Sequence, residues 1–323
     1  MLEVARIEQF VPGRQCWVGR PPKSRKALAR AFLAKGTLGT ASTKDFHELL
    51  LVDIRLRQLC GFSGRVPSLA TFSRAFAWFA DSGIADKAHA LMTKVHLSEQ
   101  TLMHVSRDAT DIRAPQKNQA EPKIKVPKKK PGPKKGVPPK PKTLTRQQRQ
   151  VGQAWQEAVA ELPIICDTGG KKDSKGKMHW WTGFKLHVDV GDGGLPVAAL
   201  TTSASVHDSQ VAIPLMKISS ERVGTVFYQL MDAGYVGESI PEAAKALGQV
   251  PIIKGKAYKS QLPVPFDPAT KTRFANRSSV ERFFSDLKMN HGGLTVRVKG
   301  HAKVHFHLMM GILSIFALAL LRL

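Results

Sequence analysis

Cysteine is scarce in this sequence. The chain of 323 residues has three cysteines, Cys16, Cys60 and Cys166, which lie far apart and form no C-x-x-C pair. This spacing argues against a disulfide framework and against a zinc knuckle. Scattered thiols fit a reducing cytosol, and the opening residues MLEVARIEQF lack the apolar segment of a signal peptide. We therefore expect a cytoplasmic protein.

Long hydrophobic runs are also missing. The apolar run Leu308–Leu321 (LMMGILSIFALALL) has only fourteen residues, whereas a helix needs roughly 20 to cross a bilayer. We predict that this run forms a buried terminal helix and that the chain has no membrane partner. The hydrophobic content of 42% is sufficient for a real core.

Acidic residues are few: 25 Asp and Glu stand against 49 Lys and Arg, which gives a formal net charge of +24. A charge of this size predicts attraction to a polyanion, with nucleic acid as the leading candidate. Residues 113–149 carry half of the charge, because they contain thirteen Lys and Arg and a single acid, Glu121.

The surrounding segment 113–153 is rich in lysine and proline. It has eight prolines and almost no large apolar side chain, so it cannot bury enough surface to offset the entropy cost of ordering. We predict a flexible, disordered basic insertion that binds DNA phosphates in a salt-dependent way. The lysines expected to bind phosphate are Lys128, Lys129, Lys130, Lys134 and Lys135.

Two regions precede the insertion. Residues 1–40 are basic and poorly patterned, apart from a short helix expected at 25–34, and we expect an N-terminal arm there. Residues 41–100 have the spacing of three short helices, which predicts an all-helical domain. A helix-turn-helix that contacts DNA and a plain helical bundle both fit this pattern, and Arg65 and Arg74 are available for phosphates.

The rest of the chain, residues 101–323, predicts an α/β domain with a mixed sheet flanked by helices, interrupted by the basic insertion. Its expected helices lie at 207–217, 238–247 and 308–321. Short apolar or alternating runs rich in β-branched and aromatic residues predict the strands. These runs are 102–108, 163–167, 180–190, 195–202, 226–231, 250–253 and 296–298.

The stretch RSSVERFFSDLK, Arg277 to Lys288, has the pattern of an amphipathic helix. Ser278 or Ser279 can cap it, and its apolar residues recur at helical spacing. Arg277, Glu281 and Lys288 share one side of such a helix. On its own, this pattern also fits a salt-bridged surface face. The apolar residues are Val280, Phe283, Phe284 and Leu287.

Two further acids, Asp108 and Asp232, each follow an apolar run that predicts a strand. Together with Glu281 they form the carboxylate set that a two-metal phosphoryl-transfer site requires. Mg²⁺ prefers carboxylate oxygens, so no His or Cys ligand is needed. Arg277 and Lys288 would then hold phosphates or orient Glu281.

Other residues compete for these roles. Asp111 lies three residues beyond Asp108, and Asp167 ends another expected strand. Asp111 is expected to fall beyond the end of its strand, and we favour Asp108. Asp208 in HDSQ is explained by helix capping or by a place near the site. Trp180 and Trp181 can stack on an extruded base, although core packing of at least one of them is the simpler explanation.

The joint order of these motifs resembles that of DDE-type transposases of bacterial insertion sequences. The family signature at the third acid is Tyr-(2)-Arg-(3)-Glu-(6)-Lys. Arg277, Glu281 and Lys288 match it, whereas Phe274 stands at the Tyr position. SRDAT at 106–110 and LMDAGY at 230–235 resemble the surroundings of the first and second acids.

The resemblance implies a ribonuclease-H-like catalytic domain in which Asp108, Asp232 and Glu281 bind Mg²⁺, or Mn²⁺ in its place. It also implies cleavage at the ends of the element, strand transfer into target DNA, and DNA partners that include terminal inverted repeats. A homodimer on paired ends, in the cytoplasm of a bacterium and associated with the nucleoid, is expected on the same ground. The alternative is a catalytically inactive, transposase-derived DNA-binding protein.

Overall fold

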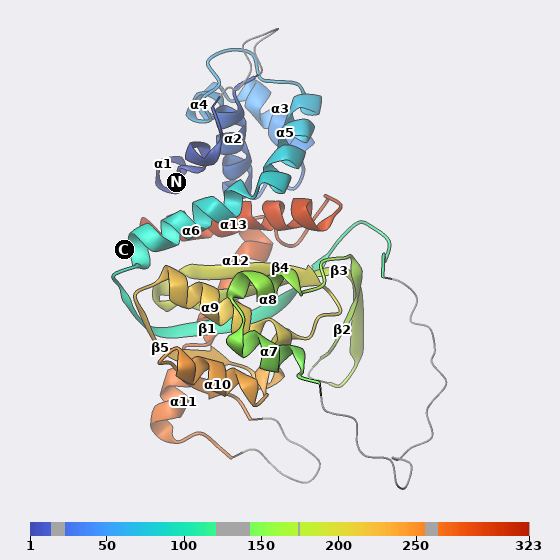
Figure 1. Ribbon diagram of the computed structural model, residues 1–323. Coiled ribbons are helices and arrows are strands. Elements are labelled where there is room, and N and C mark those ends of the chain that lie inside the picture. The colour runs from blue at the N-terminus through green and yellow to red at the C-terminus, as the bar shows by residue number, and fades with distance from the viewer. Residues whose placement is uncertain (14–22, 121–142, 174, 256–263, 323) are drawn as a thin grey trace.

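The computed structural model describes residues 1–13, 23–120, 143–173, 175–255 and 264–322 (Figure 1). Most of the predicted basic insertion, including Lys128, Lys129, Lys130, Lys134 and Lys135, lies outside the described residues. The flexibility and the phosphate binding expected of this insertion therefore stay predictions.

A six-stranded mixed sheet forms the centre of the C-terminal two thirds of the chain. Its order is β2-β3-β1-β5-β6, and β4 also pairs with β3. β1 is antiparallel to β3 and parallel to β5, and β5 is parallel to β6. The strands are β1 Thr101–Arg113, β2 Asp167–Lys172, β3 Met178–Gly191, β4 Pro196–Ser203, β5 Thr225–Met231 and β6 Val250–Ile253.

One group of helices precedes the sheet in the sequence, and a later group, which covers the sheet, lies between and after its strands (Figure 1). The N-terminal group is α1 Leu2–Ala5, η1 Ile7–Phe10, α2 Arg25–Thr37, α3 Thr43–Val52, α4 Ile54–Leu59, α5 Leu69–Ser82 and α6 Ile84–Leu97. The later helices are α7 Arg146–Gly152, α8 Trp155–Ala160, α9 Ala212–Arg222, α10 Ser239–Ala246, α11 Pro268–Ala275, α12 Ser278–Asn290 and α13 His301–Leu320. Three single turns are η2 Asp192–Gly194, η3 Asp208–Gln210 and η4 Ala233–Tyr235.

The mixed α/β fold with an N-terminal helical region is therefore confirmed. α12 packs on β1 and β3, α13 packs on β4, and α9 packs on β3 and β4. α10 packs beside α9 and β6, and α7 packs against both of these helices. The sheet is thus flanked by helices, as the sequence predicted.

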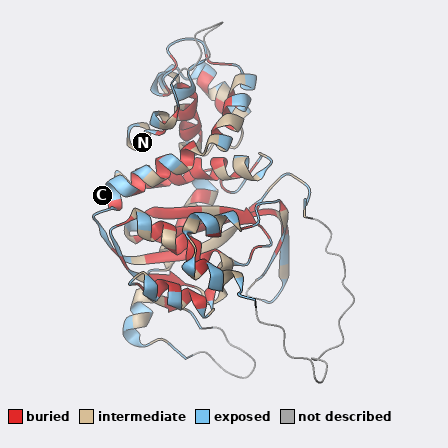
Figure 2. Ribbon diagram, viewed as in Figure 1, coloured by how far each residue is buried: buried red, intermediate tan, exposed pale blue. Residues whose placement is uncertain are grey.

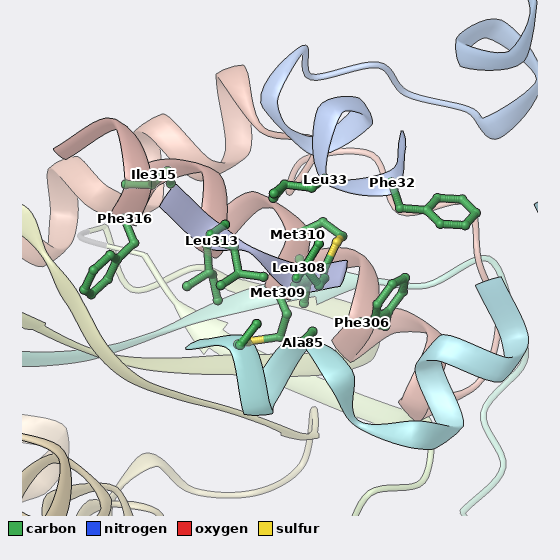
Figure 3. Packing of buried hydrophobic residues seen from close by; sticks show 14 of the residues in the cluster. Phe32, Leu33, Ala85, Phe306, Leu308, Met309, Met310, Leu313, Ile315 and Phe316 are labelled. Atoms are coloured by element: carbon green, nitrogen blue, oxygen red, sulfur yellow. The ribbon is translucent and has the colours of Figure 1, made fainter. Parts of the chain in front are cut away.

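Helix α13 lies between the N-terminal helices and the sheet (Figure 1). Phe306 contacts Phe32 of α2 at a centroid separation of 6.1 Å, and Figure 3 shows the surrounding apolar side chains of α2, α6 and α13. The helix has 20 residues and is long and apolar enough to cross a membrane, but most of it is buried inside the protein (Figure 2). The predicted burial is confirmed, although the helix is longer than the apolar run suggested.

One hydrophobic core joins the N-terminal helices to the sheet. Ile7 of η1 and Leu28, Phe32 and Leu33 of α2 belong to it, together with Val105 of β1. Residues 1–40, expected as a basic arm, therefore contribute three helical segments to the core in their described part. The short helix expected at residues 25–34 is confirmed as α2, whereas α1 and η1 were not predicted.

Several local predictions differ from the structure. The predicted strand 163–167 is irregular up to Asp167, because Ile165 and Cys166 accept hydrogen bonds from the Ser203 hydroxyl and the Gln119 N–H instead of joining a ladder. Residues 296–298 form no strand, and α11 was not predicted. Residues 207–217 are η3 followed by the start of α9, rather than one helix.

Candidate active site

A cleft of about 710 Å³ opens beside the middle of β1. Residues of β1, of the β2–β3 hairpin, of η3 and of the segment after β5 line it. Asp108, Asp111, Asp208 and Asp232 are among the lining residues, together with a group of cations. The cations are Arg113, Lys171, Lys172 and Lys185.

Strand pairing places Asp108 beside Asp232. β1 and β5 are parallel, with Ser106 opposite Leu230. Asp108 is two residues after Ser106, and Asp232 is two residues after Leu230. The two carboxylates therefore reach the cleft at neighbouring positions. β5 ends at Met231, as predicted, but β1 continues to Arg113, and Asp108 is therefore within a strand rather than at its end.

Arg277 connects the three predicted acids. Its Nη2 donates to Asp108 Oδ2 at 2.7 Å and lies 3.9 Å from Asp232 Oδ2. Its Nη1 donates to Glu281 Oε1 at 2.7 Å. The structure thus brings Asp108, Asp232 and Glu281 around one guanidinium group. Because this group is planar and has several donors, it can contact carboxylates in different directions at once.

Glu281 has the most open position of the three acids. Its side chain is 59% exposed and contacts Arg277. Glu281 is not among the residues that line the cleft. The helix α12 that carries it buries Val280, Phe283 and Leu287, as predicted. The predicted serine cap is wrong, because no described side chain caps α12 and the Ser278 hydroxyl accepts from Arg282 instead.

Lys288 lies further along α12 and contacts a different acid. Its Nζ donates to Asp111 Oδ1 at 3.0 Å. Asp111 was expected to lie beyond the end of its strand, but β1 includes it. Burial acts to raise the pKa of Asp111, but the hydrogen bond and the charge of Lys288 outweigh this effect and the pKa is lowered.

The electrostatics of Asp108 are different. Burial raises its pKa to about 6, although the charge of Arg277 and a hydrogen bond from the Ala109 N–H both act to lower it. The neighbouring charge of Asp232 adds to the increase. At neutral pH, the Asp108 carboxylate is therefore ionised, and Arg277 offsets its negative charge only in part. Further positive charge beside it would be stabilising.

Asp208, for which helix capping and a place near the site were both open, lines the cleft. Its Oδ1 accepts from Lys185 Nζ at 2.9 Å, and the His207 ring, not Asp208, caps η3. The nearby Tyr235 hydroxyl is buried with no hydrogen-bond partner among the described residues. Burial raises the pKa of Tyr235 well above its usual value, and the charges of Asp208, Asp108 and Asp232 add to this. The sequence HDSQ was the available signal for Asp208.

The donor set fits a hard divalent cation, for which carboxylate oxygens are the preferred ligands. Asp232 Oδ1 accepts from the Gly234 N–H, which fixes the carboxylate. A Cβ atom at Gly234 would lie 2.9 Å from Asp232 Oδ1 and 3.9 Å from Asp208 Oδ2, so glycine keeps this space open. Within the described ranges, no three His, Cys, Asp or Glu side chains are already gathered as a metal site; Arg277 is the cation among the acids.

The other predicted DNA-binding residues lie elsewhere. Arg65 and Arg74 line a groove of about 770 Å³ in the N-terminal helical region, together with Lys23 and Arg25. Arg25 also stacks over the Trp78 ring at 4.2 Å. Four cations in one groove give this region a surface suited to phosphate groups.

Comparison with known families gives two matches. Residues 100–317 match the family model described as "Transposase DDE domain", and residues 1–78 match one described as "Transposase domain". The first match spans β1 to most of α13 and includes the whole cleft. A search of curated proteins found no match to this chain.

Proposed function

Because the chain belongs to the family of transposases with a DDE domain, we propose that it cuts DNA at the ends of an insertion sequence and joins them to target DNA. The observation that carries this proposal is the contact of Arg277 with Asp108, Asp232 and Glu281 at a cleft lined by lysines. In the ribonuclease-H-like fold of the family, such acids act together in phosphoryl transfer.

Asp108 and Asp232 would hold a divalent cation, Mg²⁺ or Mn²⁺, and Glu281 would join them. When bound, such a cation favours deprotonation of the attacking oxygen and stabilises the charge on the leaving oxygen. In the absence of the cation, the positive charge of Arg277 reduces the repulsion between the three carboxylates. Lys171, Lys172 and Lys185 are placed to bind phosphates of the substrate strand.

Two chemical steps are proposed. In the first, water attacks the phosphorus at the element end, the bond to the 3′ oxygen breaks, and that oxygen takes a proton. In the second, the freed 3′ hydroxyl loses its proton and attacks a phosphodiester of target DNA. A new phosphorus–oxygen bond forms, and the 3′ oxygen of the target strand leaves.

A plasmid assay tests this proposal. The coding region with its natural flanking DNA is incubated with the protein and Mg²⁺, and nicked and joined products are separated on gels. We expect Asp232→Asn and Glu281→Gln to reduce both products by at least about 100-fold, since several kcal/mol of transition-state stabilisation is lost. Glu48→Gln, at an exposed acid of α3, serves as the control and should retain full activity.

Near-normal activity of either variant would contradict the assignment. Tight DNA binding by the unaltered protein without metal-dependent chemistry would instead indicate a DNA-binding protein without transposase activity. Removal of divalent cations with a chelator should abolish both products, and added Mg²⁺ or Mn²⁺ should restore them.

The N-terminal helices are proposed to contact DNA through Arg65 and Arg74, and the lysines from Lys128 to Lys135 to add contacts with phosphates. We also propose that the protein acts as a homodimer on paired terminal repeats, in association with the bacterial nucleoid. Sedimentation with repeat-containing DNA tests the dimer, because two protein copies should move with each pair of ends.

A further inference from the structure

Trp180 is an exposed aromatic residue in the catalytic cleft. Its side chain is 64% exposed, whereas its neighbour Trp181 is 8% exposed and donates its indole N–H to the Phe184 carbonyl. Trp180 lines the same cleft as Asp108 and Asp232. Core packing therefore accounts for a tryptophan at position 181, but it does not account for the exposed tryptophan at position 180.

The Trp180 ring packs against a glycine. Gly170 of β2 is the cross-strand partner of Trp180 on β3. A Cβ atom at Gly170 would lie 2.7 Å and 2.8 Å from the Cζ3 and Cε3 atoms of the ring. The six-membered part of the indole thus lies against bare backbone, a position that any other residue would block. This contact restricts the ring, so less side-chain freedom is lost on stacking.

Positively charged side chains share the cleft with the exposed ring. Lys171 and Lys172 follow Gly170 on β2, and Arg113 and Lys185 line the same cleft. An aromatic platform combined with backbone-binding cations is the chemistry by which proteins hold single-stranded nucleic acid. In a paired duplex the faces of internal bases are covered by their neighbours, so an unpaired base is the ligand that such a ring accepts.

We propose that Trp180 is a stacking platform for an unpaired nucleobase of the DNA strand whose phosphodiester reaches Asp108 and Asp232. This inference rests on the proposed function, since it specifies the state of the substrate at the same site. It implies that the DNA end is opened by at least one base pair when it enters the cleft.

Binding of synthetic DNA without divalent cations tests the platform separately from catalysis. A short blunt duplex is compared with the same duplex extended by one unpaired nucleotide, and with one extended by an abasic nucleotide. We expect the unaltered protein to prefer the unpaired base over the abasic extension by roughly 5- to 150-fold, the range for one stacked base. Trp180→Ala should remove the preference, and Trp180→Phe should keep part of it.

Two further variants control for indirect effects. Gly170→Val leaves the indole present but displaces it, and it should reduce the preference as Trp180→Ala does. Phe227→Ala removes another exposed aromatic side chain of the sheet, on β5 and outside the cleft lining, and should change nothing. Circular dichroism confirms that each variant is folded.

A fluorescent 2-aminopurine at the unpaired position gives a second measurement. Its emission should be quenched by the unaltered protein and by the catalytically impaired Glu281→Gln variant, but not by Trp180→Ala. An equal affinity for the base and the abasic extension, or quenching that persists in Trp180→Ala, would overturn the proposal. Loss of strand transfer alone would bear on the proposed function and not on this site.

Discussion

At the residue scale, a buried ion pair fixes the strand that carries Asp108. Arg107 Nε and Nη2 donate to Asp189 Oδ1 and Oδ2 at 2.7 Å and 2.6 Å, and both side chains are fully buried. Ser219 and Gln229 add hydrogen bonds to the pair. Since burial of two charges is costly, this arrangement tolerates no loss of either partner.

Asp189→Asn is therefore expected to lower the free energy of unfolding by about 3–5 kcal/mol, because the Arg107 charge would remain buried without its counterion. Urea denaturation followed by circular dichroism measures the change. The exposed pair of Lys44 and Glu48 provides the comparison, since Glu48→Gln should cost less than about 1 kcal/mol. Equal effects of the two substitutions would contradict the role of the buried pair.

The pKa of Asp108 predicts a pH-dependent contribution to stability. Burial raises this pKa to about 6, above its value in the unfolded chain, so the folded protein binds the proton more tightly. The free energy of unfolding that the protonated Asp108 carboxyl contributes is therefore fully present below about pH 4. It is lost as the pH rises through 6.

Asp108→Asn isolates this effect. The stability of the variant relative to the unaltered protein should increase between about pH 4 and pH 7 by up to roughly 3 kcal/mol, since each pKa unit corresponds to about 1.4 kcal/mol. Urea denaturation at several pH values gives the difference, in which the effects of titrating groups distant from Asp108 cancel. A difference that is constant with pH would show that the Asp108 carboxyl has an ordinary pKa.

Residue spacing predicted part of the candidate site. The interval between Arg277 and Glu281 is a helical one, and the structure has an ion pair between them. The contact of Lys288 with Asp111 was not predictable, because it depends on how far β1 extends. That extent is set by pairing with β3, about 80 residues later in the chain, and strand pairing between distant segments leaves little trace in local sequence.

At the element scale, close packing of α12 on α13 positions Glu281 and Arg277. Gly311 of α13 makes this approach possible. A Cβ atom there would lie 2.7 Å from Leu287 Cδ1 and 2.8 Å from the His291 carbonyl oxygen. The carbonyl belongs to the end of α12 and cannot move without moving the helix.

Gly311→Ala is expected to destabilise the protein by about 1–3 kcal/mol through overpacking, which exceeds the gain of up to roughly 1 kcal/mol from better helix propensity. Gly152→Ala is the matched control, since Gly152 is also helical but has open space around it. Thermal and urea denaturation compare the two variants. Gly311→Ala should also shift α12 and thereby reduce DNA cleavage. Unchanged stability and activity would contradict the close packing of α12 on Gly311.

Elements with strong periodicity were predicted well, whereas those defined by their partners were not. α12 and β5 follow from apolar spacing alone, and their bounds differ little from the prediction. The break between α3 and α4 was not expected. It arises because Asp53 caps the second helix by accepting the Leu56 N–H, and such a side-chain bond competes with continued helix.

At the scale of the whole molecule, a short segment of the sequence, residues 121–142, carries one third of the net positive charge, +8 of +24. The N-terminal helices and the sheet share one core through α13, so the basic residues cannot be concentrated there without cost. Residues 121–142, which are outside the described residues, contain nine lysines and one glutamate. We therefore expect this segment to supply part of the attraction of the protein to DNA.

Replacement of these nine lysines by glutamine keeps the chain length and removes nine charges. We expect weaker binding to any duplex and a flatter dependence of the logarithm of the binding constant on the logarithm of the salt concentration. Each lost phosphate contact reduces the slope by about 0.9, so participation of half of the lysines would change it by roughly 4. Fluorescence anisotropy from 50 to 300 mM salt, about the range in which such contacts weaken, measures the slope. Substitution of Arg65 and Arg74 by serine should change it by at most about 2, and an unchanged slope in the glutamine variant would show that the segment does not neutralise phosphates.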